Sequence, residues 1–290
     1  MSKKLLVSKK LLVCDLDNTL YDWIAYFVPS FYAMVDRVVE ITGCDRNKLL
    51  DDFRVVHQQH HDSEQPFALL ETETIKKKYA NVSWDAVVRK LDSAFHVFNS
   101  RRKQNLRLHT GVKETLEILR RHGIKLVAHT ESKLYGTVDR LHRLELFEFF
   151  ARVYCRERTV SIRPNAEDWL TRFPMEKIVE LSLHRTKPNP AVLAEICTAE
   201  AVAHDDAVYI GDSVARDVLM AKRAGVFAVW AAYGAEHSPA MYDALVRISH
   251  WTPQEVERER QLRNEARAFS PDFIARREFA EVLSVFGITA

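Results

Sequence analysis

Short apolar runs that end in polar clusters recur along this chain, and they predict strands. Continuous runs of Leu, Val and Ile are typical of strands buried on both faces, as in a parallel sheet. The runs predicted as strands are Lys10–Cys14, Ile124–Ala128, Ala207–Ile210 and Val226–Ala231. Helical patterns lie between them, at Thr110–His122, where Thr110 is the expected N-cap, and at Val214–Ala224. The alternation predicts an open, Rossmann-like α/β fold with a doubly wound parallel sheet.

Residues 23–108 interrupt this alternation and predict an all-helical insert. From Trp23 to Ile41 the apolar residues are spaced by three and four, which indicates an amphipathic helix. Asp45 is expected to begin a second helix and Ser83 a third. Because the insert follows the first predicted strand, the α/β core is discontinuous in sequence.

The end of the chain is predicted to be an extension that packs on the core. It contains a short predicted strand at Leu245–Ser249, a charged helix at Glu255–Arg267 and an apolar end at Phe279–Phe286. Residues 3–7 repeat the KKLLV of residues 9–13 and are expected to form a frayed arm or an extra edge strand. The expected domains are a discontinuous core at 1–22 and 109–238, the helical insert at 23–108 and the extension at 239–290.

Composition narrows the class of protein. The 290 residues are 47% hydrophobic and 28% charged, as in globular proteins with a substantial core. The 42 Lys and Arg against 40 Asp and Glu leave a formal charge of +2, so a nucleic-acid partner is not expected. No run approaches the ~20 apolar residues of a membrane-spanning helix. These features argue against a disordered, fibrous or membrane protein.

The cysteines are expected to be free thiols. The four of them are Cys14, Cys44, Cys155 and Cys197. They lie far apart without a CxxC pair, which disfavours a zinc site or a disulfide framework. The N-terminal residues carry positive charge but lack the ~7–15-residue apolar run of a secretory signal. A cytoplasmic protein is the simplest interpretation.

The strongest chemical signal is the pair Asp15 and Asp17, in the sequence DLDNTLY at the end of the first predicted strand. Two carboxylates just beyond a strand can converge on the crevice where open α/β sheets bind ligands. Taken alone, the motif fits an acidic turn before a helix equally well.

Further polar residues follow at other strand ends, in a definite order. Thr130 closes the second predicted strand, and Lys187 lies in the sequence TKPNP before a helix. Asp212 and Asp217 occur in GDSVARD after the next strand. Each of these residues alone is more often structural. Together with the first pair, they bring carboxylates, a hydroxyl and an ammonium to one edge of the sheet.

The combination of DxDxT with GDSxxxD at this separation resembles the haloacid dehalogenase-like hydrolase superfamily. The resemblance covers about residues 10–22 and 108–234. The insert lies where that superfamily has a helical cap, between its first and second motifs, and residues 23–108 are called the cap below. The resemblance implies a Mg²⁺-dependent phosphatase that hydrolyses a small phosphate monoester, such as a phosphoglycolate, a sugar phosphate or a nucleotide.

The resemblance also implies a role for each motif residue. Asp15 would be the nucleophile that forms an aspartyl-phosphate, and Asp17 would be the general acid and base. Thr130 and Lys187 would hold the phosphoryl oxygens, and Lys187 would also screen the charge of Asp15. A cation such as Lys187 is needed because a phosphate dianion repels a carboxylate nucleophile.

The same resemblance implies a Mg²⁺ site. The ion would be bound by the Asp15 carboxylate, the Asp17 backbone carbonyl and the Asp212 carboxylate, with Asp217 in support. Mg²⁺ prefers oxygen ligands and keeps several waters, and a carboxylate cluster beside a substrate phosphate suits that preference.

Two positions refine this expectation. The dehalogenases of the superfamily lack the second aspartate, so Asp17 points to phosphoryl transfer. Glu131 follows Thr130 where many relatives carry Asn, and an anion is unfavourable beside a bound phosphate. We therefore expect Glu131 to point away from the phosphate site or to interact with a cation.

Two other functions stay open. A phosphomutase or phosphotransferase would use the same site with an acceptor hydroxyl in place of water. A non-catalytic binding protein on this fold would be expected to lack a motif aspartate, and none is missing. The expected partner is a small phosphorylated metabolite, with neither nucleic acid nor membrane, for a chain that is a monomer or a homodimer.

Two further features have a structural and a functional interpretation. His57 and His61 are four residues apart on a predicted helix, a spacing that can chelate a metal, but a metal site is the less favoured interpretation. The arginine-rich stretch at 156–185 is either a solvated surface insertion or a second contact for an anion over the pocket.

Overall fold

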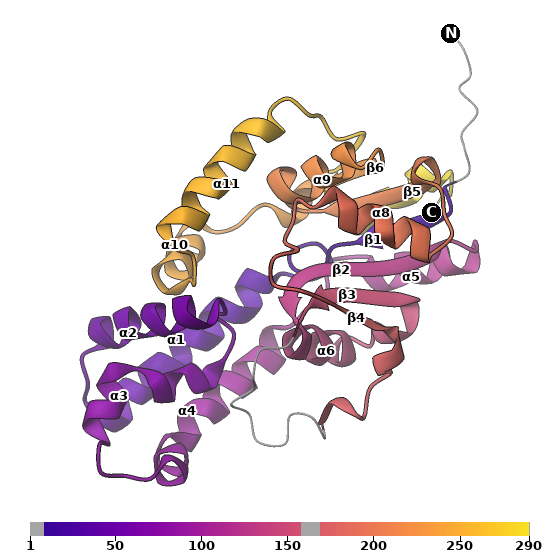
Figure 1. Ribbon diagram of the computed structural model, residues 1–290. Coiled ribbons are helices and arrows are strands. Elements are labelled where there is room, and N and C mark those ends of the chain that lie inside the picture. The colour runs from indigo at the N-terminus through magenta and orange to yellow at the C-terminus, as the bar shows by residue number, and fades with distance from the viewer. Residues whose placement is uncertain (1–8, 158–168, 290) are drawn as a thin grey trace.

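The computed structural model describes residues 9–157 and 169–289. Its centre is one parallel sheet whose seven strands lie in the order β4-β3-β2-β1-β5-β6-β7 (Figure 1). The strands are β1 (Leu11–Cys14), β2 (Lys125–Lys133), β3 (Arg152–Arg156), β4 (Ile178–Leu181), β5 (Ala207–Gly211), β6 (Phe227–Ala231) and β7 (Phe273–Ala275). The four predicted strands are confirmed as β1, β2, β5 and β6. The arm predicted at residues 3–7 lies outside the described residues.

Helices cover both faces of this sheet, so the predicted doubly wound α/β fold is confirmed (Figure 1). The core helices are α5 (Val112–Arg121), α6 (Leu134–Arg143), α8 (Pro190–Ala199), α9 (Leu219–Arg223) and the 3₁₀ helix η7 (Phe279–Phe286). Shorter 3₁₀ segments are η2 (Phe147–Phe149), η3 (Met175–Lys177), η4 (His204–Asp206) and η6 (Ala232–Gly234). Apolar residues of α5, α6 and η7 pack on one face of the sheet, and those of α8 and α9 pack on the other.

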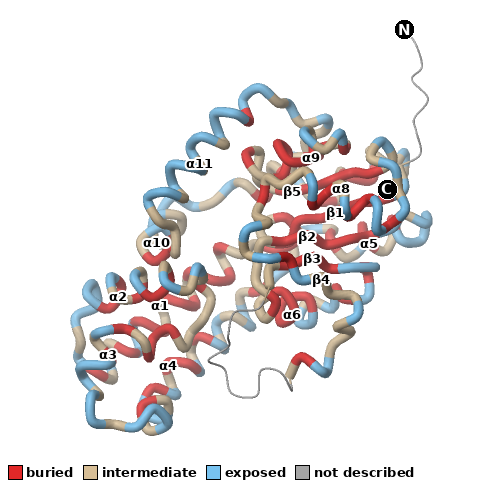
Figure 2. The backbone as a smooth tube through the Cα atoms, in the orientation of Figure 1, coloured by how far each residue is buried: buried red, intermediate tan, exposed pale blue. Residues whose placement is uncertain are grey.

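The central strand β1 shows why a continuous apolar run is required. Leu12 and Cys14 belong to the apolar cluster on the α5 and α6 face. Leu11 and Val13 belong to the cluster on the α8 and α9 face. Successive residues of a strand point to opposite faces, so a strand covered on both sides needs apolar residues at every position. The central strands β1 and β5 are accordingly buried along their whole length (Figure 2).

Two core helices differ from the sequence prediction. α5 begins at Val112 after Gly111, whose φ of 74° suits a glycine, so Thr110 is not the N-cap. The helix predicted at Val214–Ala224 consists of a π-helical turn, η5 (Val214–Val218), followed by α9. Such turns are rare and often occur at functional sites.

The cap is all-helical, as predicted. Its elements are α1 (Trp23–Thr42), α2 (Arg46–His60), η1 (Pro66–Glu71), α3 (Glu73–Lys78) and α4 (Trp84–Asn105). Asp22 and Asp45 cap α1 and α2, because each side chain accepts a hydrogen bond from a backbone amide of the first turn. Ser83 precedes α4 without such a bond. Among the described residues, no helix combines the length and the apolar character that crossing a lipid bilayer requires.

Aromatic side chains form the centre of the cap. The ring of Phe31 lies 4.8 Å from that of Phe53 and 5.7 Å from that of Phe27, and Phe98 contacts Phe27 at 6.5 Å, all between ring centroids. These four side chains are almost wholly buried. They join one apolar cluster that continues into the α5 and α6 face of the core, so the cap and the core are packed together rather than separated by solvent.

One part of the C-terminal extension contacts the cap and another part contacts the core. The prediction of a strand at Leu245–Ser249 is wrong, because most of this segment forms the last turn of helix α10 (Pro239–Ile248). Leu245 and Ile248 are both buried, and their spacing of three residues fits one face of a helix. α10 contacts α1 and α2, which differs from the expectation that the whole extension packs on the core. α11 (Pro253–Ala266) then leads back to the core, where it contacts η5 (Figure 1).

We predict that Phe31→Ala lowers the free energy of unfolding by about 3–5 kcal/mol, because it leaves a cavity among packed rings. Val55→Ala is the matched control in the same domain, since Val55 is 54% exposed, and it should cost less than about 0.5 kcal/mol. Urea unfolding followed by circular dichroism measures both. Equal losses would show that the ring cluster does not stabilise the cap.

Candidate active site

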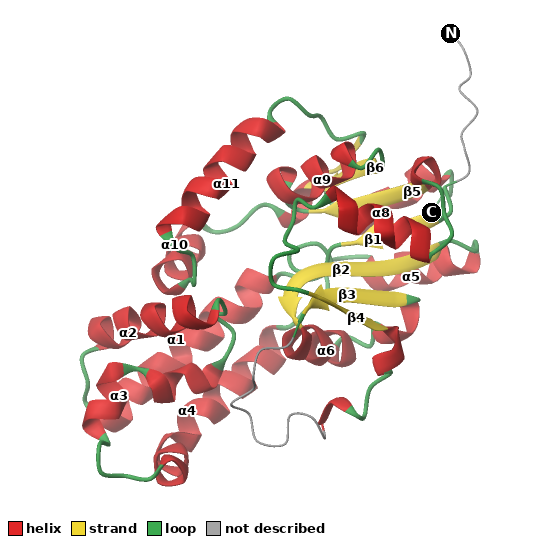
Figure 3. Cartoon of the chain, viewed as in Figure 1, coloured by secondary structure: helices red, strands yellow, loops and turns green. Residues whose placement is uncertain are grey.

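The motif residues meet at the carboxyl edge of the sheet, where loops face the cap helices (Figure 3). β1 pairs in parallel with β2 on one side and with β5 on the other. The carboxyl ends of these three strands are therefore adjacent. Asp15 follows β1, Thr130 lies in β2 and Asp212 follows β5, so side chains far apart in sequence come together there.

Lys187 joins two of the carboxylates. Its Nζ donates hydrogen bonds to Asp15 Oδ1 at 2.6 Å and to Asp217 Oδ1 at 2.8 Å. Thr19, the threonine of DxDxT, donates from Oγ1 to the other oxygen of Asp15 at 3.3 Å. All four side chains are buried. Each carboxylate thus has a cationic partner, which buried charges require.

Burial and neighbouring charges shift the pKa values of this group. Burial raises the pKa of Asp15 from 3.8 to about 7; Lys187 opposes this rise, whereas Asp217 and Asp17 add to it. Burial alone would lower the pKa of Lys187, but Asp15 and Asp217 outweigh it and raise that pKa well above its ordinary value. Lys187 is therefore a permanent cation at neutral pH, beside a carboxyl group that exchanges its proton near neutrality.

Three carboxylates form a candidate metal centre. One oxygen each from Asp15, Asp212 and Asp217 lies within 4.8 Å of the other two. Within the described parts of the chain, no hydrogen-bond donor reaches the Asp212 carboxylate. Burial raises the pKa of Asp212 well above its ordinary value, and the charges of Asp15 and Asp217 add to that rise. A hard cation with oxygen ligands would relieve this repulsion, so the residues present fit Mg²⁺.

Gly211 makes room for one member of this group. A Cβ at Gly211 would lie 2.4 Å from Asp217 Oδ2, closer than any side chain tolerates. The same oxygen accepts a hydrogen bond from the Ser213 amide at 3.0 Å. The glycine of GDSVARD is therefore needed to let Asp217 rest against the end of β5.

Asp17 lies in a network of hydroxyl groups. Tyr21 Oη donates to Asp17 Oδ1 at 2.7 Å, and Ser132 Oγ donates to Oδ2 at 2.5 Å. Thr130 Oγ1 lies 3.4 Å from the same Oδ2. Both oxygens of the carboxylate thus accept hydrogen bonds. Thr130 was predicted from its strand end, whereas Ser132 was not, although it lies two residues further along β2 and shares that face.

A buried arginine completes this network, and nothing in the sequence pattern predicts it. Arg140 lies in α6 with no exposed surface. Its guanidinium donates to Tyr21 Oη at 2.9 Å and to Ser132 Oγ at 2.6 Å, pairs with Glu64 of the cap, and lies 3.4 Å from Asp17 Oδ1. Five residues from three parts of the chain therefore share one buried charge network.

Glu131 interacts with a cation, as expected. Its carboxylate accepts a hydrogen bond from Arg216 Nη1 at 2.7 Å and another from the Lys187 amide at 3.1 Å. Arg216 also contacts Glu259 of α11 at 3.0 Å. Glu131 is thus neutralised by a residue of the GDSVARD motif and, through its carboxylate, also fixes the backbone of Lys187.

The two histidines do not form a metal centre. His57 is buried, and its Nδ1 contacts the Ile248 carbonyl at 2.6 Å. His61 lies beyond the end of α2 and is half exposed, 4.0 Å from Glu255. The single metal-type cluster found among the described residues is the aspartate group above. Part of the arginine-rich stretch, residues 158–168, lies outside the described residues.

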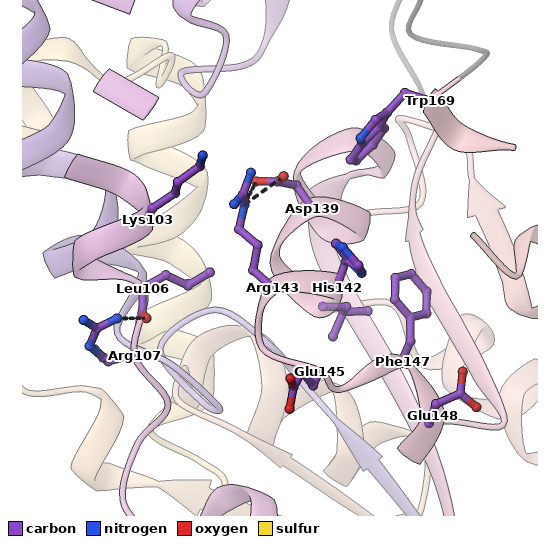
Figure 4. A pocket seen from close by; sticks show the side chains of 11 residues that line it. Lys103, Leu106, Arg107, Asp139, His142, Arg143, Glu145, Phe147, Glu148 and Trp169 are labelled. Atoms are coloured by element: carbon purple, nitrogen blue, oxygen red, sulfur yellow. Dashed lines mark hydrogen bonds and ion pairs between the residues drawn. The ribbon is translucent and has the colours of Figure 1, made fainter. Parts of the chain in front are cut away.

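A depression of about 760 Å³ lies beside α6 (Figure 4). Residues at the end of α4, residues of α6 and Trp169 line it. Its charges are mixed, since Lys103 and Arg143 line it together with Asp139, Glu145 and Glu148. None of the motif residues reaches it, so it is separate from the aspartate cluster.

Solved structures share this fold. A 2-haloacid dehalogenase from Pseudomonas syringae pv. tomato DC3000 matches with a TM-score of 0.58 and 21% identity, covering 96% of this chain and 98% of that one. A candidate β-phosphoglucomutase from Thermotoga maritima matches with a TM-score of 0.50 and 17% identity, again covering 96% and 98%. At such low identity the similarity shows the fold alone. A comparison with curated proteins found no match.

The family is shown by the sequence itself. A family model described as haloacid dehalogenase-like hydrolase matches residues 9–225, which include the cap and all six motif residues. The resemblance first suggested by DxDxT and GDSxxxD is therefore confirmed, and this chain belongs to the haloacid dehalogenase-like hydrolases.

Proposed function

We propose that this hydrolase is a Mg²⁺-dependent phosphatase that acts on small phosphate monoesters through an aspartyl-phosphate. One observation carries the proposal: two aspartates at the same strand end have different surroundings. Asp15 contacts an ammonium and belongs to the metal-type cluster, as a nucleophile for an anionic substrate requires. Asp17 accepts hydrogen bonds from hydroxyl groups on both oxygens, as an oriented proton carrier requires.

In the first step, an oxygen of Asp15 attacks phosphorus and the bond to the leaving oxygen breaks. Lys187 offsets the charge repulsion between the carboxylate and the phosphate. Asp17, in its protonated form, transfers its proton to the leaving oxygen, so that an alcohol rather than an alkoxide departs. Thr130 lies at the same edge, where its hydroxyl can contact a phosphoryl oxygen.

In the second step, water replaces the alcohol. The water oxygen attacks the phosphorus of the aspartyl-phosphate, and Asp17, now ionised, accepts a proton from this water. The phosphorus–oxygen bond to Asp15 breaks, its electron pair returns to the carboxylate, and inorganic phosphate leaves. One carboxyl group thus serves as acid and then as base.

Asp15, Asp212 and the Asp17 carbonyl would hold the metal, with Asp217 in support. When bound, Mg²⁺ supplies positive charge that stabilises the phosphoryl oxygens in the transition state. Asp217 contacts Lys187 and the Ser213 amide, so it keeps the cation-binding edge in place without being needed as a direct ligand.

The cap limits the substrate to a small ester. Trp23 and Glu64 of the cap lie next to the Asp17 network, so a bound leaving group must fit between these residues and the sheet edge. No disulfide joins cysteines among the described residues, which suits a reducing cytoplasm. We propose a small phosphorylated metabolite of the cytoplasm as the substrate.

Asp15→Asn should abolish phosphate release from every ester in a panel of sugar, nucleotide and short-chain acid phosphates. The amide cannot form the aspartyl-phosphate, so the loss should exceed about 10³-fold. Asp85→Asn, an exposed change in the cap, is the control and should leave turnover unchanged. The assay contains Mg²⁺ and no added acceptor. Folded wild-type protein that releases no phosphate from any ester would contradict the proposed function, and release only with an acceptor hydroxyl would favour a phosphotransferase.

Mg²⁺ should bind more tightly as pH rises towards 7. Binding needs ionised carboxylates, and the raised pKa of Asp15, about 7, means that a proton must leave as the ion binds. Titration calorimetry at about pH 6 and pH 8, in buffers of different ionisation enthalpy, measures both affinity and proton release. Asp212→Asn should weaken binding at both values. An affinity that does not change with pH would contradict the site.

The same shift determines how stability depends on pH. A carboxyl group with a raised pKa stabilises the folded, metal-free protein most below pH 3.8, and this contribution is lost as pH rises through about 7. Mg²⁺ should therefore raise the melting temperature more at pH 8 than at pH 6. Thermal unfolding with Mg²⁺ and with a chelator tests this, and an equal rise at both pH values would argue against it.

A further inference from the structure

Arg140 is an unusual residue for its position. It lies in the middle of α6, where its side chain has no exposed surface, and arginine stays charged in any such environment. A guanidinium has donors and no acceptor, so each of its partners must accept a hydrogen bond. Its partners are the hydroxyl oxygens of Tyr21 and Ser132 and the carboxylate of Glu64, and its Nη2 also lies 3.4 Å from Asp17 Oδ1.

This chemistry fixes the direction of two hydroxyl protons. Tyr21 Oη accepts from Arg140 Nε at 2.9 Å, so its own proton cannot point at Arg140 and is free to point at Asp17 Oδ1, 2.7 Å away. Ser132 Oγ accepts from Arg140 Nη2 at 2.6 Å and in turn donates to Asp17 Oδ2 at 2.5 Å. One buried cation thereby directs a donor to each oxygen of the Asp17 carboxylate, which fixes the plane of that group.

The third partner of Arg140 comes from the cap. Glu64 lies between α2 and η1; one of its oxygens pairs with Arg140 Nη1, and the other accepts from Trp23 Nε1 at 3.0 Å. The end of α2, just before Glu64, has a second contact with the core, because Lys133 Nζ donates to the His60 carbonyl at 2.8 Å. The cap thus supplies the counter-charge for Arg140.

Gly136 shows how closely this pair is fitted. A Cβ at Gly136, one turn before Arg140, would lie 3.1 Å from Arg140 Nη1 and 3.3 Å from Glu64 Oε2. The absence of a side chain there leaves the space that the ion pair occupies. The helix surface is therefore shaped for this contact between the cap and the core.

We propose that Arg140 is a positioning residue that orients Asp17 through Tyr21 and Ser132, and that Glu64 makes this orientation depend on the cap. The inference rests on the proposed function and adds to it. In the structure, Asp17 accepts hydrogen bonds on both oxygens, so the network holds in place the carboxylate that takes a proton from water in the second step. Loss of the network should therefore slow hydrolysis of the aspartyl-phosphate.

The test uses an aryl phosphate whose leaving group is acidic, such as 4-nitrophenyl phosphate. Its first step needs little help from an acid, so kcat/KM reports phosphoryl transfer to Asp15, whereas kcat reports the water step. In Arg140→Lys, which keeps the charge but cannot span three partners, kcat should fall by about 10²-fold while kcat/KM changes by less than about threefold. A burst of nitrophenol and an accumulated phosphoenzyme should accompany the fall.

Matched variants separate positioning from stability. Arg143→Lys changes an arginine of the same helix that pairs with Asp139 rather than with Asp17, and it should leave both constants unchanged. Glu64→Gln keeps the shape of the cap contact and should lower kcat with a burst, by less than Arg140→Lys does. Should Arg140→Lys not fold, Tyr21→Phe removes the donor to one oxygen and should give the same signature, with kcat lower by about tenfold.

The outcomes are distinguishable. A fall of kcat and kcat/KM by the same factor, without a burst, would overturn the role of Arg140, and a Glu64→Gln variant equal to wild type would overturn the dependence on the cap. Wild-type protein that releases no phosphate from the aryl ester or from the ester panel above would instead overturn the proposed function.

Discussion

The contact of Lys187 with two carboxylates determines the geometry of the carboxyl edge of the sheet. The side chain is only 3% exposed, and moving such charges out of water costs several kcal/mol for each ion. Mutual contact compensates this cost only at hydrogen-bond distance. β1, which leads into Asp15, and the turn that carries Asp217 must therefore hold their positions to within a few tenths of an ångström. Gly211 and the Ser213 amide serve the same requirement, because they let Asp217 lie against the strand.

The part of the site that could be predicted consists of residues that directly follow apolar runs. Asp15 and Asp212 are of this kind, because a buried strand and its polar end are both visible in the sequence. Arg140 could not be predicted, since a charged residue between others in an amphipathic helix usually faces solvent. Its burial arises only when Glu64 of the cap and Tyr21 meet it in the folded chain. Such partners have no fixed spacing in sequence.

The same limit explains the errors in the fold. The pattern of apolar and polar residues at Leu245–Ser249 fits a strand and a helix equally well. Packing against the cap selects the helix. β7, at Phe273–Ala275, has three residues and depends on pairing with β6. The central strands have no such ambiguity, because burial on both faces demands apolar side chains at every position. Prediction was therefore most successful where a single requirement, burial, determined the choice of residue.

The position of α10 has a consequence for how the cap can move. Two neighbouring chain segments, before α1 and after α4, join the cap to the core, and a body held in this way can rotate about the line between them. α10 packs on α1 and α2 of the cap. Residues 249–252 connect it to α11, which contacts η5 of the core. This third attachment lies away from that line and restrains the rotation. Swinging of the cap must therefore either carry α10 and the adjoining His250 and Trp251, which also contact the cap, or break these contacts. Any opening of the cap over Asp15 therefore also involves α10, a helix that lies outside residues 23–108 of the cap.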